Sequence, residues 1–211
     1  MSQGPGRDCD RCPRLVEFRL TQRRLHGDWH NAPVPSFGAF DARLLIVGLA
    51  PGLKGANRTG RPFTGDFAGD LLYRTLAKFD FARGRYDARA DDGFALIDCR
   101  VSNAVRCVPP ENKPEIAEIK SCNSYLAEEI EAMSRLKVIL ALGAIAHGAV
   151  LTALERRKSL YKFAHGARHD LSQNLALADS YHCSRYNTNT GVLTVEMFEA
   201  VIRAIRDGIE R

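Results

Sequence analysis

Short apolar runs alternate along this chain with segments whose apolar residues recur every three or four positions. The first pattern is typical of buried strands, and the second of amphipathic helices. Their alternation predicts an α/β fold of three αβα layers, with a mainly parallel sheet covered on both faces. Strands are expected at 43–48, 94–99, 136–142 and 175–180, and 101–106 is either a further short strand or an extended loop. Helices are expected at 13–25, 68–79, 114–133, 144–154 and 195–209.

Two loops stand out because each directly follows an apolar run. Gly48–Asp66 follows the first run and His182–Gly191 follows the last. Both are rich in Gly, Asn, Thr and Arg, which supply hydrogen-bond donors and unusual backbone conformations. Ligands of parallel sheets bind beyond the carboxyl ends of the strands, where these loops and Asn103 are expected. The sequence therefore predicts that the two loops form one pocket for an anionic, planar group.

Composition places the chain among single-domain proteins with a basic surface. The 211 residues are 45% hydrophobic, with a net charge of +5 and a pI of about 9.0. This charge favours a polyanionic partner, although a basic enzyme without one is nearly as well supported by charge alone. No apolar run is long enough to cross a membrane, and Met1–Asp8 has no apolar signal core. We therefore expect one cytoplasmic domain over residues 1–211 with a disordered leader at 1–8.

The chain has six cysteines, which in a cytoplasmic protein are not expected to form disulfides. Cys9 and Cys12 form a Cys-x-x-Cys pair near the chain start, where core packing would not explain them. Cys107 and Cys122 are separated by fourteen residues, which suits a bulky cluster better than a compact zinc knuckle. The alternative for Cys122 is a core position on its helix. The spacing favours an iron–sulfur cluster bound by these four cysteines.

Five motifs occur in order along the chain. They are CDRCPRL at Cys9–Leu15, GLAPG at Gly48–Gly52, GANRTGRPFTGD at Gly55–Asp66, NAVRCVPP at Asn103–Pro110, and the loop His182–Gly191. Together they resemble the iron–sulfur uracil-DNA glycosylases of family five. The resemblance implies a four-stranded parallel sheet and a [4Fe–4S] cluster. It also implies excision of uracil, and of other deaminated bases such as hypoxanthine and xanthine, from DNA by hydrolysis to an abasic site.

The resemblance assigns roles to residues of the predicted pocket. Phe63 would stack on the flipped base, Asn103 would bind its polar edge, and His182 would donate a hydrogen bond to the departing base. Ala50 and Gly52 belong to the same base-binding loop. Each of the first three has a plainer alternative: a core phenylalanine, a turn-capping asparagine and a structural histidine.

Breaking the glycosidic bond also calls for a group that stabilises the positive sugar and positions water. Family four has an acid at the position of Leu49, and this chain lacks it, as family five generally does. Asp66 is the nearest acidic candidate, although it equally suits the N-cap of the following helix, and the two roles are compatible. Asn57 is a second polar candidate.

Basic and polar residues of both loops are expected to contact the DNA backbone. They are Lys54, Arg58, Arg61, Ser184, Arg185 and Tyr186. Arg185 or Tyr186 could also wedge into the gap that the flipped base leaves. The alternative for each cation is an ordinary solvated surface position.

The second loop departs from the family pattern at one position. Cys183 stands where the family usually has the proline of His-Pro-Ser. Loss of proline removes a fixed φ angle, which predicts a more mobile loop. The thiol could be sensitive to oxidation, but a small residue tolerated in a tight turn is the simpler interpretation.

Three other functions remain as alternatives: a family-four glycosylase, a non-catalytic iron–sulfur DNA sensor and a nucleotide-binding α/β protein. Leu49 disfavours the first. The loop Gly48–Gly55 disfavours the third, because it lacks both the dinucleotide fingerprint and a P-loop ending. No motif places a lysine for Schiff-base chemistry, so we expect a monofunctional, monomeric enzyme. Its cluster is expected to order the basic segment 11–24 rather than to perform redox chemistry.

Overall fold

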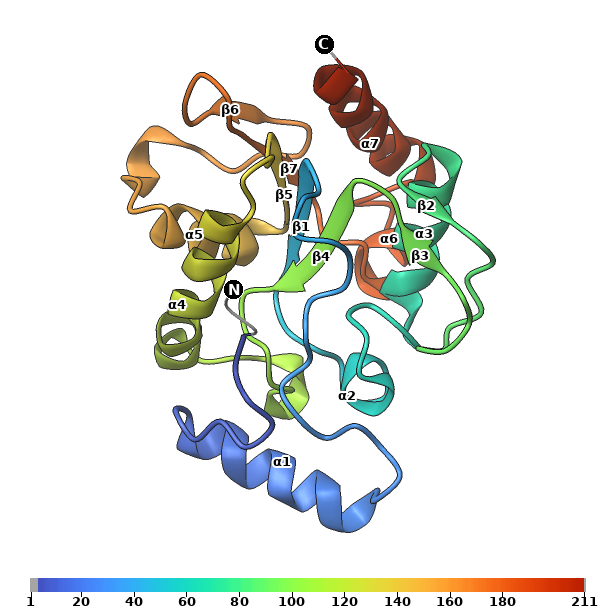
Figure 1. Cartoon of the computed structure of the whole chain (residues 1–211), viewed down its shortest axis with the longest axis vertical. Coiled ribbons are helices and arrows are strands. Elements are labelled where there is room, and N and C mark those ends of the chain that lie inside the picture. Colours follow the sequence, from blue (N-terminus) through green and yellow to red (C-terminus); the bar gives the residue numbers. More distant parts are fainter. Residues whose placement is uncertain (1–3, 211) are drawn as a thin grey trace.

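The computed structural model describes residues 4–210, in which a central sheet lies between two layers of helices (Figure 1). The strand order is β4-β1-β5-β7-β6. The first four strands are parallel, and β6 runs antiparallel to β7. Their bounds are β1 Leu44–Gly48, β4 Cys99–Asn103, β5 Val138–Leu142, β6 Arg168–Asp170 and β7 Ala176–Ser180. The predicted parallel four-stranded sheet is confirmed, and β6 is an antiparallel addition at its edge.

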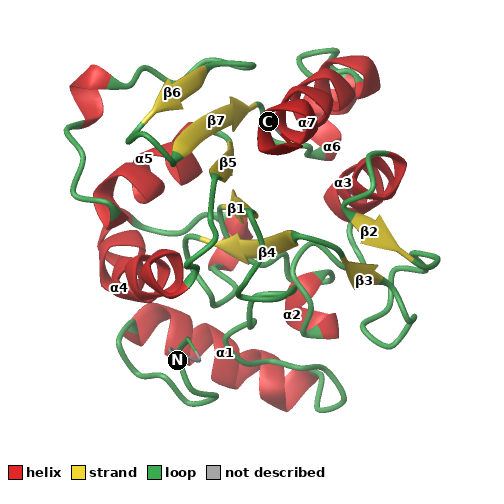
Figure 2. Cartoon of the chain, turned by 45° about the horizontal axis from the view of Figure 1, so that its top comes forward, coloured by secondary structure: helices red, strands yellow, loops and turns green. Residues whose placement is uncertain are grey.

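Helices cover both faces of the sheet, as both views show (Figures 1 and 2). On one face lie α4 (Ile116–Ala132) and α5 (Ala144–Ala153), and on the other lie α3 (Phe67–Lys78) and α7 (Val195–Glu210). Every residue of the four parallel strands is buried, which explains why these strands show no alternation of polar and apolar residues. None of the described helices combines the length and apolar character needed to cross a membrane.

The helix boundaries follow from capping and amphipathic pattern. In α7, Phe198, Ile202, Ile205 and Ile209 are at most 2% exposed and form the stripe that packs into the core. Residue 115 caps α4 through a reciprocal capping box with Glu118, so the helix begins just after the predicted Pro114.

The predicted strand at 94–99 is wrong. Within that run, β3 (Ala95–Leu96) pairs with β2 (Ala82–Arg83) in a small separate ladder. The sheet strand is β4, which straddles the two predicted segments. Two polar residues of β4 are buried because Glu129 of α4 accepts hydrogen bonds from Arg100 Nε at 2.6 Å and Ser102 Oγ at 2.7 Å. A pattern based on hydrophobicity could not detect a strand whose polar side chains are paired internally.

The predicted disordered leader is also corrected. Residues 1–3 lie outside the described part of the chain, but Arg7 and Asp8 are held against α1 (Pro13–Leu25). Arg23 of α1 donates to Asp8 Oδ1 at 2.6 Å and to the Arg7 carbonyl at 3.0 Å. These contacts bring the neighbouring Cys9 toward the rest of the fold.

The predicted pocket loops gather beyond the carboxyl ends of the strands, on the side of the sheet where α1 lies (Figure 1). Gly48 and Asn103 end β1 and β4 and pair with each other in register. The short helices of this region are α2 (Ala56–Thr59), the 3₁₀ turn η1 (Pro110–Asn112) and α6 (Arg185–Asn189). A further 3₁₀ turn, η2 (Lys158–Leu160), lies between α5 and β6 in the sequence.

Candidate active site and cysteine site

A cavity of about 600 Å³ opens at the carboxyl ends of β1 and β4. The loop after β1, the end of β4, the 3₁₀ turn and the loop after β7 all contribute to its wall. The lining residues are Leu49, Ala50, Pro51, Gly52, Leu53, Lys54, Gly55, Phe63, Asp66, Phe67, Ala68, Asn103, Asn112, His182, Ser184 and Arg185. Its volume lies within the range of small-molecule sites. The two loops singled out from the sequence therefore do meet around one cavity.

The aromatic wall of the cavity depends on a glycine. A side chain on Gly48 would collide with the Phe63 ring and with Asn103 Oδ1, so both groups can lie against the end of β1 only because it is glycine. The Phe63 ring lies 6.0 Å from the His182 ring, centroid to centroid, with the planes inclined by 30°. Phe63 also packs into the hydrophobic core, so its core role and a stacking face are both present.

Asn103 places a buried hydrogen-bond acceptor without a described partner in the cavity wall. Its side chain is buried, and its Oδ1 has no hydrogen-bond partner among the described residues. Leaving a buried acceptor unpaired costs about 1–3 kcal/mol, and such groups are rare in folded proteins. The described hydrogen bonds give no support to a turn-capping role for this side chain.

His182 faces the same cavity from the loop after β7. Its ring makes no hydrogen bond to any described residue, while its backbone carbonyl accepts one from Asn187 Nδ2 at 2.8 Å. Burial lowers the pKa of His182 below its ordinary value of 6.5. The imidazole is therefore neutral at pH 7 and retains one N–H that can be donated into the cavity.

Asp66 caps a helix and also lines the cavity. Its Oδ1 accepts a hydrogen bond from Gly69 N at 3.1 Å and so caps α3. Its Oδ2 faces the first loop so closely that a Cβ on Gly55 would lie 2.5 Å away. Burial raises the pKa of this carboxyl above 3.8, and the backbone N–H groups of Gly69 and Ala68 offset part of that rise.

Four predicted site residues do not line the cavity: Asn57, Arg58, Arg61 and Tyr186. Two of them, Asn57 and Arg61, are buried. Asn57 lies on α2 and is buried; its Nδ2 donates to Asn31 Oδ1 at 2.8 Å, and its Oδ1 has no partner among the described residues. Arg61 is only 5% exposed, and both of its terminal nitrogens bind Asp92 at 2.8 Å. No face of this guanidinium is free for a phosphate, and the predicted DNA contact of Arg61 is corrected.

The buried Arg61–Asp92 pair instead supports the segment that carries Phe63. Phe63 has a φ of +53°, a conformation that is strained for a non-glycine residue and needs surrounding support. The Tyr86 hydroxyl donates to the Phe63 carbonyl at 3.2 Å. Four aromatic rings lie 5.1–6.0 Å from the guanidinium carbon of Arg61: Phe37, Tyr73, Tyr86 and Phe94.

The other predicted DNA contacts remain on the surface around the cavity mouth. Lys54 and Arg185 are exposed and line the cavity, and Arg58 is exposed nearby in the first loop. Ser184 caps α6 by accepting a hydrogen bond from the backbone of residue 187 at 3.4 Å. Tyr186, in the first turn of α6, is 74% exposed.

Sequence reasoning missed Asn112, which also lines the cavity. It lies in the 3₁₀ turn after β4, is exposed, and has a φ of +58°. Asparagine tolerates this left-handed conformation better than most residues. The one sequence signal was the Pro109-Pro110 pair, which indicates a turn just before Asn112. Without the correct position of β4, that turn could not be assigned to the cavity.

Cys183 is fully buried, and burial raises the pKa of its thiol to about 12. A buried, protonated thiol is a poor target for oxidants. The structure therefore supports the simpler interpretation of a small residue in a tight turn.

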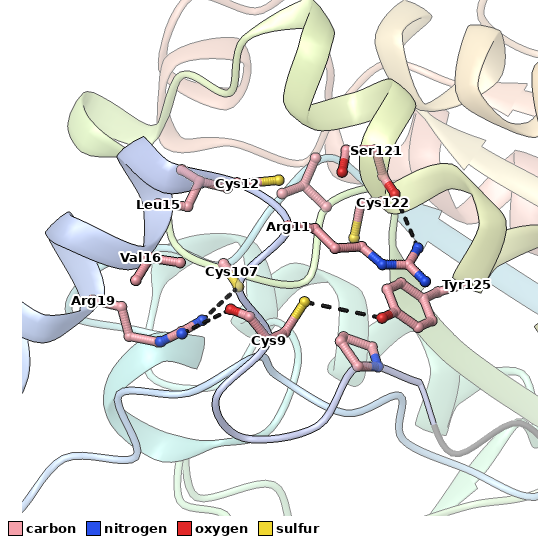
Figure 3. Close-up of a pocket in the computed structure, with 12 residues that line it drawn as sticks. Cys9, Arg11, Cys12, Leu15, Val16, Arg19, Cys107, Ser121, Cys122 and Tyr125 are labelled. Atoms are coloured by element: carbon pink, nitrogen blue, oxygen red, sulfur yellow. Dashed lines mark hydrogen bonds between the residues drawn. The ribbon is translucent and has the colours of Figure 1, made fainter.

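The four predicted cysteine ligands line one hollow between α1 and α4 (Figure 3). Cys9 and Cys12 precede α1, Cys107 follows β4, and Cys122 lies on α4. Across the described residues, no three of these sulfur atoms lie within 4.8 Å of one another. A single tetrahedral zinc would bring its sulfur ligands to about 3.8 Å. The spacing of the thiols therefore fits a larger group, such as an iron–sulfur cubane.

The surroundings of the hollow suit an anionic cluster. Arg19 is buried, and it donates to Cys107 Sγ at 3.5 Å and to the Cys9 carbonyl at 2.8 Å. Leu15 and Val105 exclude water from the same space. Hydrogen bonds to sulfur and exclusion of solvent are the means by which proteins tune such clusters.

Comparison with known proteins defines the class first. The chain matches the uracil DNA glycosylase superfamily over residues 35–206, so it belongs to that superfamily. Within this superfamily, the chain is similar over most of its length to type-5 uracil-DNA glycosylases. It is 42% identical to a type-5 uracil-DNA glycosylase of Thermus thermophilus, over 92% of this chain and 90% of that protein. It is 40% identical to a type-5 uracil-DNA glycosylase of Pyrobaculum aerophilum, over 93% of this chain and 87% of that protein.

Similarity to family-four proteins is weaker and shorter. A type-4 uracil-DNA glycosylase of Pyrobaculum aerophilum is 33% identical over 72% of this chain and 63% of its own length. The resemblance to family five inferred from the motifs is therefore confirmed.

Proposed function

We propose that this protein removes uracil from DNA by hydrolysing the bond between the base and deoxyribose. One observation carries the proposal: Asn103, whose buried Oδ1 has no hydrogen-bond partner among the described residues, lines the same cavity as Phe63 and His182. The similarity to type-5 uracil-DNA glycosylases over more than nine-tenths of the chain supports the same activity.

Recognition of the base follows from the chemistry of Asn103 and Phe63. Uracil offers one N–H donor beside a carbonyl acceptor, and an amide can accept from the first while donating to the second. The Phe63 ring provides an apolar face for a base that has left the stack, which costs a few kcal/mol, roughly, to unpair and unstack. The pocket thus selects a planar ring with that donor–acceptor edge.

Cleavage leaves negative charge on the departing base and positive charge on the sugar. His182 is neutral because burial lowers its pKa, and its N–H donates to the base oxygen as charge builds there. The Asp66 carboxylate stabilises the positive sugar and positions the attacking water. No residue is needed to form a covalent intermediate, so the product is an abasic site in an uncut strand.

Binding of DNA is assigned to the exposed rim of the cavity. Lys54, Arg58 and Arg185 are suited to phosphates, and Ser184 lies beside them. Tyr186 is the best-placed side chain to fill the gap that the flipped base leaves, because it is large and 74% exposed.

The cysteine hollow is assigned to a [4Fe–4S] cluster held by Cys9, Cys12, Cys107 and Cys122. When bound, the cluster would cross-link the segment before α1, the loop after β4 and helix α4. The residues around it support a structural role, since Arg14 of α1 also pairs with the buried Glu118 of α4 at 2.8 Å.

The test compares excision of different bases by the wild type and Asn103→Ala. DNA duplexes carrying uracil or hypoxanthine are incubated with cluster-loaded protein and then cleaved at abasic sites with hot alkali. We expect wild-type protein to release uracil. Loss of two hydrogen bonds should reduce kcat/KM by about 100-fold for uracil and by a similar factor for hypoxanthine, whose N1–H and O6 present the same donor–acceptor edge.

Asn31→Ala is the matched control, because Asn31 is a buried asparagine outside the cavity. It should lower stability while keeping the wild-type kcat/KM on both bases. An unchanged kcat/KM on both bases in Asn103→Ala would refute base-edge recognition. A folded, cluster-loaded wild type that releases no base would instead indicate a DNA-binding sensor.

A further inference from the structure

A second group of metal-ligand side chains lies apart from both sites described above. His147 of α5, His169 of β6 and Asp179 of β7 each place one ligand atom within 4.8 Å of the others. Asp179 and His147 are buried, and the His169 side chain is 16% exposed. None of the three lines the active-site cavity or the cysteine hollow. The glycosylase reaction therefore gives no reason for a histidine pair around a buried carboxylate.

The hydrogen bonds of His147 orient one nitrogen for a cation. Its Nε2 lies 3.0 Å from the Tyr161 carbonyl oxygen, which can only accept, so Nε2 carries a hydrogen. Its Nδ1 lies 2.8 Å from Asp179 Oδ1, and in the neutral ring this nitrogen is also an acceptor. A donated N–H to a backbone carbonyl is the usual way in which a metal-bound histidine is oriented.

His169 completes the group from the opposite side of the carboxylate. Its Nε2 lies 3.3 Å from Asp179 Oδ2, so each carboxylate oxygen faces an imidazole nitrogen from a different element. The two histidine rings are inclined by 70° with centroids 5.6 Å apart, so they do not stack on each other. Two imidazoles and a carboxylate are donors that zinc and similar ions prefer.

We propose that His147, His169 and Asp179 bind one divalent transition-metal ion, with Zn²⁺ as the best fit. Zinc bonds of about 2.0–2.2 Å require donor separations of about 3.4 Å, which shifts of about 1 Å in the side chains can supply. Three protein ligands leave one position for water on the partly exposed side of His169. The ion joins α5, β6 and β7 and fixes the antiparallel edge strand to the sheet.

Titration with Co²⁺ tests the site, because its visible spectrum reports the ligand type. Cluster-loaded protein is dialysed against a chelator and titrated with Co²⁺ alone. We expect one Co²⁺ per chain, d–d bands of nitrogen and oxygen ligation, and no sulfur-to-cobalt charge-transfer band. Zn²⁺ should displace the Co²⁺ and raise Tm by about 5 °C. Absence of binding, or a spectrum with sulfur bands, would overturn the proposal.

Two histidine variants locate the ion. His169→Gln removes the least buried ligand and should weaken Co²⁺ binding by at least about 10-fold. His165→Gln is the control: His165 lies on the same segment but contacts the backbone N of Tyr181 at 3.2 Å rather than Asp179. It should bind Co²⁺ like the wild type. Equal binding by both variants would place the ion elsewhere and refute the assignment. Uracil excision reports that each variant is folded.

Discussion

Asp66 shows how one side chain can stabilise a helix and still be electrostatically costly. Its carboxylate caps α3 through Gly69 N, yet it is partly buried beside the cavity and forms no ion pair with a described cation. Burial of an unpaired charge destabilises the fold, and this is why the pKa of Asp66 is raised. A purely structural cap would not need the charge, because asparagine caps a helix about equally well.

Asp66→Asn should therefore separate stability from activity. The variant keeps the cap and loses the charge, so we expect uracil excision to fall by about 100-fold. A carboxyl whose folded pKa is raised contributes stability below its unfolded pKa and loses that contribution as pH rises through the folded pKa. At pH 7 the uncharged variant should thus have a Tm equal to or above that of the wild type. A variant that keeps full activity would remove Asp66 from the reaction.

The pH profile gives a second readout of the same residue. If excision needs the ionised carboxyl, the acidic limb of kcat/KM must lie above pH 3.8, the ordinary Asp value, because burial raises the pKa of Asp66. The limb should disappear in Asp66→Asn. His182 should add no loss at neutral pH, because its pKa is lowered and the ring is already neutral there.

At the scale of elements, the loop between β2 and β3 supports the base-stacking segment. Asp92, in this loop, is buried against Arg61, and its pKa is strongly lowered by the Arg61 hydrogen bonds. The pair fixes the segment just before Phe63, whose backbone is strained. A distant loop that contributes nothing to the cavity wall therefore helps to place an aromatic ring within it.

Asp92→Asn should be strongly destabilising, because it leaves the Arg61 charge buried and unpaired. We expect a loss of about 3–5 kcal/mol, which corresponds to a Tm lower by about 10 °C for a protein of this size. Asp91→Asn is the matched control, because the Asp91 side chain is 81% exposed in its pair with Arg89. The control should change Tm by about 1 °C or less. Similar Tm values for the two variants would show that the buried pair does not support the fold.

At the scale of the whole molecule, α1 is attached to the α/β fold mainly through polar contacts and the cysteine hollow. Arg14 binds Glu118 of α4, and Arg19 reaches the carbonyl of Cys9 and the sulfur of Cys107. Only Leu15 of the helix is a fully buried apolar side chain. A cluster that cross-links these segments would therefore contribute much of the attachment energy.

Cys9→Ala should lose the brown colour of an iron–sulfur cluster and lower Tm. Visible absorbance, iron content and a thermal melt measure both effects on the same sample. Cys99→Ala is the control, because Cys99 is buried in the core away from the hollow. It should keep its iron and colour and lose stability only through packing, about 1 kcal/mol. Full iron content in Cys9→Ala would remove Cys9 from the ligand set.

Elements of the fold were predicted correctly from the sequence where the interacting partners are close in the chain. Helix α1 and strand β5 were predicted closely because the residues that define them are neighbours in the sequence. Pro13 marks the start of α1, and β5 is one continuous apolar run. Strand β4 was misplaced because Arg100 and Ser102 are satisfied by Glu129, which lies on a helix further along the chain. Arg61 was assigned to DNA for a similar reason, since its partner Asp92 lies 31 residues away.

The sequence alone determined the layered fold, the two loops and the membership in a glycosylase family, since apolar periodicity and ordered motifs are properties of the chain itself. Only the tertiary structure decided which polar groups remain unpaired. Asn57 and Asn103 look equivalent in sequence, and each keeps a buried Oδ1 that has no partner among the described residues. The fold pairs the Nδ2 of Asn57 with Asn31 away from the cavity, and it places Asn103 in the cavity wall. The physical reason is that hydrogen-bond partners, burial and pKa depend on residues that the fold brings together from distant parts of the chain.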